Sequence, residues 1–246
     1  MSSLFQNFLV EPLYNVLVFL LNVIPFADLG VAVIILTIFV RIVLFPISKN
    51  AIKSQIKMKE IAPQMKELQE KYKDDRQKLA IETMQLYRDN NVKPFASILM
   101  IFIQLPIIFA LYFVFFREGL PNINLDILYS FISAPENVSV NFLLIDLTKK
   151  SLILAAVAAF TQFLQAKILM SRNNHNLTPT ENQTEKEKMM NDIMKGMQIQ
   201  MKYVMPVFMG FIAYSLGGVI ALYFATSNTF SIFQELYLTK KFVTKK

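Results

Sequence analysis

The sequence of 246 residues contains no cysteine and no tryptophan, and it has a single histidine, His175. A chain without cysteine forms no disulfide and offers neither a thiolate nucleophile nor a lipoprotein-type attachment point. One histidine is too few for an imidazole metal cluster. These absences exclude most thiol-dependent and metal-dependent enzymes, and we expect no catalytic site, no metal and no cofactor.

Charged residues are also scarce. They make up 17% of the chain, whereas 54% of the residues are apolar and 22 are phenylalanine. The mean hydropathy is +0.41. Soluble domains carry about 25% charged residues, which cover the surface that faces water. Because this chain lacks that polar surface, the composition predicts a membrane protein.

Four apolar stretches are long enough to cross a bilayer, which takes about 20 residues. They cover residues 28–48, 94–116, 151–170 and 203–237. The last stretch is too long for one span, and the turn signal Gly217-Gly218 divides it into 203–216 and 218–237. The sequence therefore predicts an all-α membrane protein with five transmembrane helices.

The 25 lysine and arginine residues predict the orientation, because positive charge is retained on the cytoplasmic side. Eleven lie in 49–93, six lie from Lys167 to Lys202, and four lie in the basic tail 238–246. The loop 117–150 contains only three, namely Arg117, Lys149 and Lys150. We expect the N-terminus outside and the C-terminus in the cytoplasm, and we interpret the net charge of +7 as a topology signal rather than a nucleic-acid site.

The N-terminal segment 1–27 is apolar, but four of its polar residues fall on one helix face. These are Asn7, Glu11, Asn15 and Asn22. A polar stripe of this kind is typical of a helix that lies in the membrane interface, here on the outer side. The alternative is a sixth span.

Two polar regions are expected in the cytoplasm. Segment 49–93 has apolar residues at three-and-four spacing on both sides of a turn at Lys73-Asp74-Asp75, which predicts a helical hairpin. Pro63 should kink or interrupt its first arm. The loop 171–202 begins with a stretch of very low apolar content, 171–188, which is typical of a mobile segment.

Seven methionines lie at mostly helical spacing near the start of the fourth span, at positions 189, 190, 194, 197, 201, 205 and 209. Flexible thioethers suit a promiscuous apolar surface. The alternative is that these side chains simply face lipid or the protein core.

Arg41 lies well inside the first predicted span. An unshielded guanidinium there costs at least about 2.5–3.5 kcal/mol. The second, third and fourth spans contain no aspartate or glutamate to pair with it. Helix packing alone does not require a charged side chain inside the membrane, and such a charge normally marks function. Arg41 is therefore the strongest candidate for a functional residue.

Other polar side chains gather in the cytoplasmic halves of four spans. They are Thr37 with Arg41, Ser97 with Gln104, then Thr161, Gln162 and Gln165, and finally Ser227, Asn228 and Ser231. If these faces converge, they form a substrate-binding groove that is open to the cytoplasm and lipid and closed on the outer side. The alternative is that small polar residues only pack and hydrogen-bond the helices together.

Several segments in order resemble one known family. They are VRIVLFPIS, SQIKMKEIAPQMKELQEKYKDDRQKL, ETMQLYRDNNVKPF, IQLPIIFALYFVF, TQFLQAKILM, YVMPVFMGF and GGVIALYFATSN. The chain resembles the YidC-type membrane protein insertases of the YidC/Oxa/Alb family, in a short form without a large external domain.

The resemblance implies a multi-pass insertase and chaperone of the bacterial cytoplasmic membrane. Such a protein accepts nascent membrane proteins from the ribosome, alone or beside the Sec translocon, with the signal recognition machinery as a further candidate partner, and releases them into the lipid bilayer. It also implies that Arg41 lies in a cytoplasm-facing hydrophilic groove. The alternative is a small-anion transporter that uses Arg41, although the odd number of spans and the lack of an inverted repeat disfavour it.

Overall fold

The fold is a bundle of long helices in a computed structural model, which describes residues 3–24, 26, 28–73, 75–171, 196 and 199–243. The helices are α1 (Ser3–Phe5), α2 (Glu11–Val23), α3 (Leu29–Val43), α4 (Phe45–Glu60), α5 (Ala62–Lys71), α6 (Arg76–Asp89), α7 (Ala96–Phe116), α8 (Leu152–Ser171), α10 (Met205–Leu216) and α11 (Gly218–Val243). Two π-helical turns, Gln6–Val10 and Gln200–Val204, precede α2 and α10.

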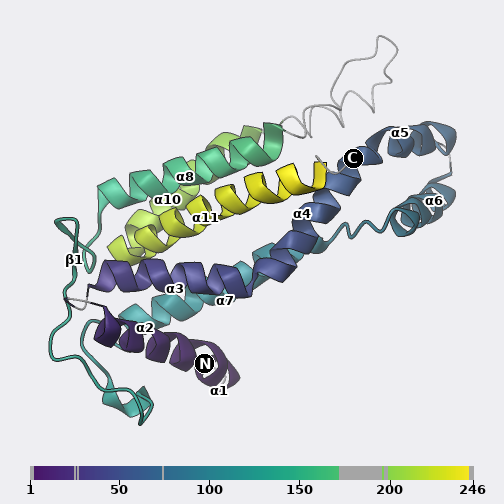
Figure 1. Ribbon diagram of the computed structural model, residues 1–246. Helices are drawn as coiled ribbons and strands as arrows, with labels where there is room; N and C mark the ends of the chain where they lie inside the picture. The colour runs from purple at the N-terminus through teal and green to yellow at the C-terminus, as the bar shows by residue number, and fades with distance from the viewer. Residues whose placement is uncertain are drawn as a thin grey trace.

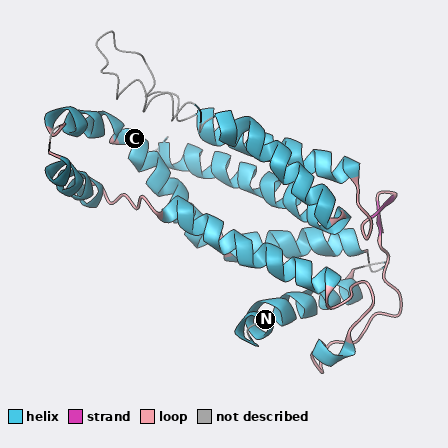
Figure 2. Ribbon diagram, turned by 180° about the vertical axis from the view of Figure 1, so that it is seen from behind, coloured by secondary structure: helices cyan, strands magenta, loops and turns pink. Residues whose placement is uncertain are grey.

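The bundle has two distinct ends, which Figures 1 and 2 show from opposite sides. The helices α5 and α6 project from one end, which we call the α5–α6 end. The other end carries the long connection 117–150, which contains a short 3-10 helix (Leu125–Ile127) and the strands β1 (Asn141–Phe142) and β2 (Ile145–Asp146). We call it the β-hairpin end. Apart from these two short strands, the regular structure among the described residues is helical.

The first predicted span, 28–48, is not one continuous helix. The helix α3 ends at Val43, and α4 begins at Phe45 with its axis bent by 61°. Pro46 stands in the first turn of α4, where its missing N–H group leaves no intrahelical bond unmade. The proline therefore starts a new helix instead of continuing the old one, and the predicted span 28–48 is divided between α3 and the first turn of α4.

The helices α5 and α6 pack against each other on either side of the predicted turn, and they are the arms of the hairpin expected in 49–93. Pro63 interrupts the first arm as expected, because α4 ends at Glu60 and α5 begins at Ala62. The residues before this break belong to α4, which packs against α7 and α11. Of the predicted turn, Lys73 and Asp75 lie between the arms, whereas Asp74 lies outside the described residues.

The helix lengths fit a membrane protein but do not confirm five spans. By length and composition, Ser3–Val23 and Leu152–Met170 could each cross a membrane, and the bent pair α3 and α4 would be a third crossing. The apolar segment Phe102–Phe116 of α7 and the 12 residues of α10 are shorter. The first of these helices, α1 to α2, was expected to lie in the interface, and its length keeps the alternative of a further span open.

Two residues on the polar face of the N-terminal helix, Asn15 and Asn22, contact protein, whereas Asn7 and part of Asn22 are exposed. Asn15 is only 1% exposed; its amide nitrogen donates to the carbonyl oxygen of Ile127 at 2.8 Å, and its oxygen accepts from the Tyr129 N–H at 2.7 Å. Asn22 donates in the same way to the carbonyl of Ser133. Asn15 and Asn22 therefore attach the connection 117–150 to α2, a role that sequence periodicity alone does not distinguish from contact with the membrane interface.

The helices α8, α10 and α11 pack closely through small residues. A Cβ atom added to Gly210 would lie 2.8 Å from the Cβ of Ala159, which is far below van der Waals contact. Ala155, Ala158 and Ala213 are buried along the same seam. Small residues let helix backbones approach in a membrane, where lipid tails provide no hydrophobic drive for association.

The predicted turn between the fourth and fifth spans is confirmed. Gly217 has φ of 94°, a backbone conformation that residues with a side chain rarely adopt, and it ends α10. The fifth helix is longer than predicted, since α11 continues to Val243 and includes Lys240 and Lys241 of the predicted basic tail.

Some expectations concern residues that lie outside the described part of the chain. These are residues 172–188, with His175, of the segment 171–188 that was expected to be mobile, and the methionines at positions 189, 190, 194 and 197. Of the remaining methionines, Met201 and Met205 are about half exposed.

Candidate functional site

Arg41 reaches from α3 to α11, where it hydrogen-bonds to a neutral hydroxyl. Its Nε donates to Ser227 Oγ at 2.9 Å, and its Nη2 donates to the same oxygen. Arg41 makes no ion pair with a carboxylate among the described residues. A guanidinium has five N–H groups, so this contact leaves three for water or for a substrate. The positive charge is therefore held in place but not neutralised.

A second contact joins α7 to α11 beside the first. The amide nitrogen of Gln104 donates to the hydroxyl of Tyr223 at 2.5 Å, and Tyr223 is only 3% exposed. The Tyr223 hydroxyl also interacts with Ser227, one helical turn further along α11. Gln104 is thus connected to Arg41 through two side chains of α11.

A third contact joins α8 to α11. The amide nitrogen of Asn228 lies 3.4 Å from both the carbonyl oxygen of Ala158 and the hydroxyl of Thr161. Asn228 is 6% exposed, so this side chain is satisfied inside the bundle. The helix α11 consequently presents Tyr223, Ser227 and Asn228 to three neighbouring helices. We call this set the Arg41 cluster; its members are Arg41, Gln104, Thr161, Tyr223, Ser227 and Asn228.

Four of the other predicted groove residues do not join these contacts. Thr37 is 2% exposed, and its hydroxyl donates to the Val33 carbonyl of its own helix at 2.6 Å, so its side chain is enclosed and does not line an open surface. Ser231 donates to the carbonyl of Ser227 at 2.9 Å. Gln162 and Gln165 are partly exposed. The side chain of Ser97 lies outside the described part of the structure.

Most of the Arg41 cluster lies just past the last buried residues of the apolar core, whereas Tyr223 belongs to that core. Toward the β-hairpin end the core is continuous, and its last members on these helices are Leu36, Ile107, Ala158 and Ala225. The next residues toward the α5–α6 end include Arg41, Gln104, Thr161 and Ser227. The boundary is therefore at one level of the bundle, although α7 runs in the opposite direction to the other three helices.

A buried amide lies beyond the cluster on α11. Gln234 is 6% exposed, and its Nε2 has no hydrogen-bond partner among the described residues. Leaving a buried donor unpaired costs about 1–3 kcal/mol.

A cleft of about 290 Å³ lies further out, between α5 and α6, where Glu67, Lys71 and Glu82 are among the lining residues. That cleft is apart from the Arg41 cluster.

Tyr223 is the site residue that sequence reasoning missed. It lies in an apolar run, Val219–Ala225, where its ring contributes to the hydrophobic character of the last span. Its position four residues before Ser227 places it on the same helix face, and this spacing is the signal that could have found it.

A helical bundle with an unneutralised arginine at the edge of its core defines a membrane protein with a polar interior site. The model of the 60Kd inner membrane protein family matches residues 19–246. The chain therefore belongs to this family, and it is a protein of a bacterial membrane.

Curated relatives cover most of the chain. It is 36% identical over 221 residues to the membrane protein insertase YidC of Oceanobacillus iheyensis. This match covers 88% of the present chain and 77% of the relative. The proteins of the same name from Fusobacterium nucleatum and Clostridium tetani are 29% and 30% identical. The matches cover 96% and 98% of this chain, and 99% and 95% of those relatives.

Proposed function

We propose that this chain is a membrane protein insertase, which moves hydrophobic segments of newly made proteins from the cytoplasm into the lipid bilayer. Membership of the family and the names of its relatives support this function, which involves no enzymatic reaction. The charge distribution supports an orientation with the α5–α6 end in the cytoplasm and the β-hairpin end outside. Five spans, with α2 at the outer interface, are part of the proposal.

The observation that carries the mechanism is the shared boundary between the apolar core and the Arg41 cluster. A substrate that enters from the α5–α6 end would meet hydroxyl, amide and guanidinium groups, and the continuous core beyond them would stop it from crossing. The polar groups replace part of the water shell of the substrate's hydrophilic tail. The barrier that remains is the passage of that tail through the rest of the membrane.

Arg41 would attract an acidic residue in that tail. The Coulomb energy between two charges grows as the dielectric constant falls, so the attraction is stronger beside the core than in water. The hydrophobic part of the substrate can meanwhile leave between helices, driven by its own transfer free energy of about 25 cal/mol per Å². The short helix α10 would locally thin the bilayer and shorten the polar crossing.

The α5–α6 hairpin is the proposed contact for the partners that deliver substrate. Its arms carry charged side chains, and Ile81 and Met84 are exposed at 66% and 46%. The ribosome, the Sec translocon and the signal recognition machinery are the candidate partners.

The test is crosslinking of a photoreactive residue to a stalled nascent membrane protein, in a chain that rescues an insertase-depleted bacterium. A probe at Gln104 should crosslink, whereas a matched probe at the adjacent Leu105, which is 45% exposed and faces away from the cluster, should not. Equal crosslinking from both positions would contradict a groove at the cluster, and failure to rescue would contradict the insertase function itself.

Water accessibility separates this proposal from the small-anion transporter. Because the chain has no native cysteine, single cysteines can be placed without background. Ser231→Cys should react with a water-soluble maleimide, and Ala221→Cys, inside the core, should not. A transporter must expose both positions in some state of its cycle.

A further inference from the structure

The β-hairpin end carries two leucines in an unusual conformation. Leu143 and Leu144 form the two-residue loop between β1 and β2, and their φ angles are 46° and 69°. Loops of this kind favour asparagine and glycine, because both loop positions require a positive φ angle. A positive φ angle is unfavourable for leucine, and the two side chains are 79% and 101% exposed. An apolar, strained hairpin tip in water is unfavourable on both counts.

The hairpin is fixed to the ends of the bundle helices. The first N–H of α3, at Leu29, donates to the Ser139 carbonyl at 2.9 Å, and the first N–H of α11, at Gly218, donates to the Lys149 carbonyl at 2.8 Å. The ring of Phe142 covers Gly30, where a Cβ atom would clash with it at 2.4 Å. The tip is therefore held at the level where the bundle helices begin (Figure 1).

Residues typical of a membrane surface surround this level. Lys149 and Lys150 are exposed beside β2, and the Nζ of Lys150 lies 5.9 Å from the ring centre of Tyr214. Tyrosine rings gather at the boundary between lipid and water, and lysine ammonium groups there contact anionic headgroups. Leu152 and Ile153 in the first turn of α8 are 73% and 65% exposed, as lipid-facing residues are.

We propose that the Leu143–Leu144 tip inserts into the headgroup and acyl boundary of the bilayer and anchors the β-hairpin end to phospholipid. The apolar tip would leave water, and Lys149 and Lys150 would lie among phosphate groups. A protein partner fits less well, because two side chains provide a small part of the roughly 1,200 Å² that stable protein interfaces bury. This anchor does not depend on the Arg41 cluster or on the insertase function.

The chain has no tryptophan, so one introduced indole reports on its own position. Leu144→Trp and Leu143→Trp would be reconstituted separately, in the full chain, into vesicles that contain phospholipids brominated at shallow or deep acyl positions. We expect shallow bromines to remove roughly half of the emission, and deep bromines to remove less. The matched control is Glu136→Trp, at an exposed charged position of the same connection, which should remain unquenched.

A second variant separates lipid anchoring from simple turn strain. Leu143→Asn/Leu144→Gly suits the positive φ angles and removes the apolar tip. In vesicles, the Leu29 and Leu147 amides of this variant should exchange with deuterium several-fold faster than those of the original chain, because the anchor is lost. Exchange that is unchanged or slower in vesicles, or tryptophans at 143 and 144 that stay unquenched while the protein is folded, would overturn the proposal. Quenching of the tryptophans at 143 and 144 should also differ between anionic and neutral vesicles, because Lys149 and Lys150 contact anionic headgroups.

Discussion

The two halves of the bundle differ in how their helices are held together. Toward the β-hairpin end, the helices pack through a continuous apolar core and small residues such as Ala155 and Gly210. At the level of Arg41, hydrogen bonds between polar side chains also join α3, α7 and α8 to α11. A dry half blocks water and ions, whereas a polar half can exchange its partners for water or substrate. The comparison indicates that rigidity and substrate contact are assigned to different ends of one bundle.

The largest expected effect comes from removing the charge in the polar half. Arg41→Ala should reduce insertion of substrates with acidic external tails by about tenfold to a hundredfold, since a hydrogen bond to a charged group contributes about 1.5–3 kcal/mol. Neutral tails should be affected less, and Arg41→Lys should be tolerated. Protease protection of tails in vesicles measures both, with Ile42→Ala as the neighbouring control. Equal loss for acidic and neutral tails would refute the charge role.

The dry half can be broken at its closest helix contact. Gly210→Val would force a side chain against Ala159 on α8, where even a Cβ atom does not fit. Overpacking of this kind costs about 1–3 kcal/mol of folding free energy. Thermal unfolding in detergent should show a lower midpoint, whereas Gly196→Ala, which meets open space, should leave it unchanged. An unchanged midpoint for Gly210→Val would show that α8 and α10 do not pack as described.

A smaller effect should separate the hydrogen bond between α7 and α11 from the charge itself. Tyr223→Phe removes the hydroxyl that accepts from Gln104 and should cost about 0.5–1.5 kcal/mol. Arg41 keeps its contact with Ser227, so the preference for acidic tails should survive while overall insertion falls. Tyr214→Phe, outside the cluster, is the control in the same assay. Loss of the acidic preference in Tyr223→Phe would mean that Tyr223 positions Arg41.

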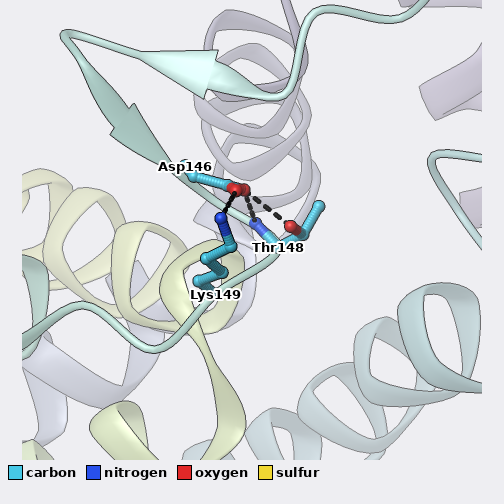
Figure 3. A network of polar contacts seen from close by, with 3 residues as sticks. All are labelled: Asp146, Thr148 and Lys149. Atoms are coloured by element: carbon cyan, nitrogen blue, oxygen red, sulfur yellow. Dashed lines mark hydrogen bonds and ion pairs between the residues drawn. The ribbon is translucent and has the colours of Figure 1, made fainter.

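The smallest effect concerns the pH dependence of the β-hairpin end. The Thr148 hydroxyl, which donates to Asp146 at 2.6 Å, and then the Lys149 ammonium lower the pKa of the Asp146 carboxyl from 3.8 to about 2 (Figure 3). A lowered pKa means that this local stabilisation is complete above about pH 4 and is lost as the pH falls toward 2.

The variant Thr148→Val should raise the pKa of Asp146 toward its ordinary value, so the loss should begin at higher pH. Hydrogen exchange of the hairpin amides between pH 2 and 5, corrected for intrinsic rates, measures the shift. The same pH profile of hydrogen exchange in both proteins would show that the Thr148 hydroxyl does not lower the pKa of Asp146.

Much of the helix pattern could be predicted because it depends on local chemistry. Pro63 interrupts the first hairpin arm, and Gly217 ends α10, since each residue limits the backbone by its own covalent structure. Pro46 carried the same information, but the apolar residues around it made 28–48 look like one span. The continuation of α11 to Val243 was missed because a basic sequence is equally compatible with a helix or an extended tail.

The site could be predicted in part. Arg41, Gln104, Thr161, Ser227 and Asn228 lie together because they share faces that helical periodicity reveals. Thr37 shares the face of Arg41 but is enclosed by the core. Tyr223 was not predicted because its aromatic ring makes it resemble the apolar residues around it. Periodicity gives the direction of a side chain but not what the neighbouring helix places opposite it.

The sequence by itself determined the membrane environment, the helix breaks and the isolated charge, because hydropathy, proline, glycine and lysine counts act through the solvent and the local backbone. Only the tertiary structure decided which hydroxyl holds Arg41, where the core ends, and that Asn15 and Asn22 of α2 contact the connection 117–150. Those contacts join residues more than 100 positions apart, and their geometry depends on how whole helices pack.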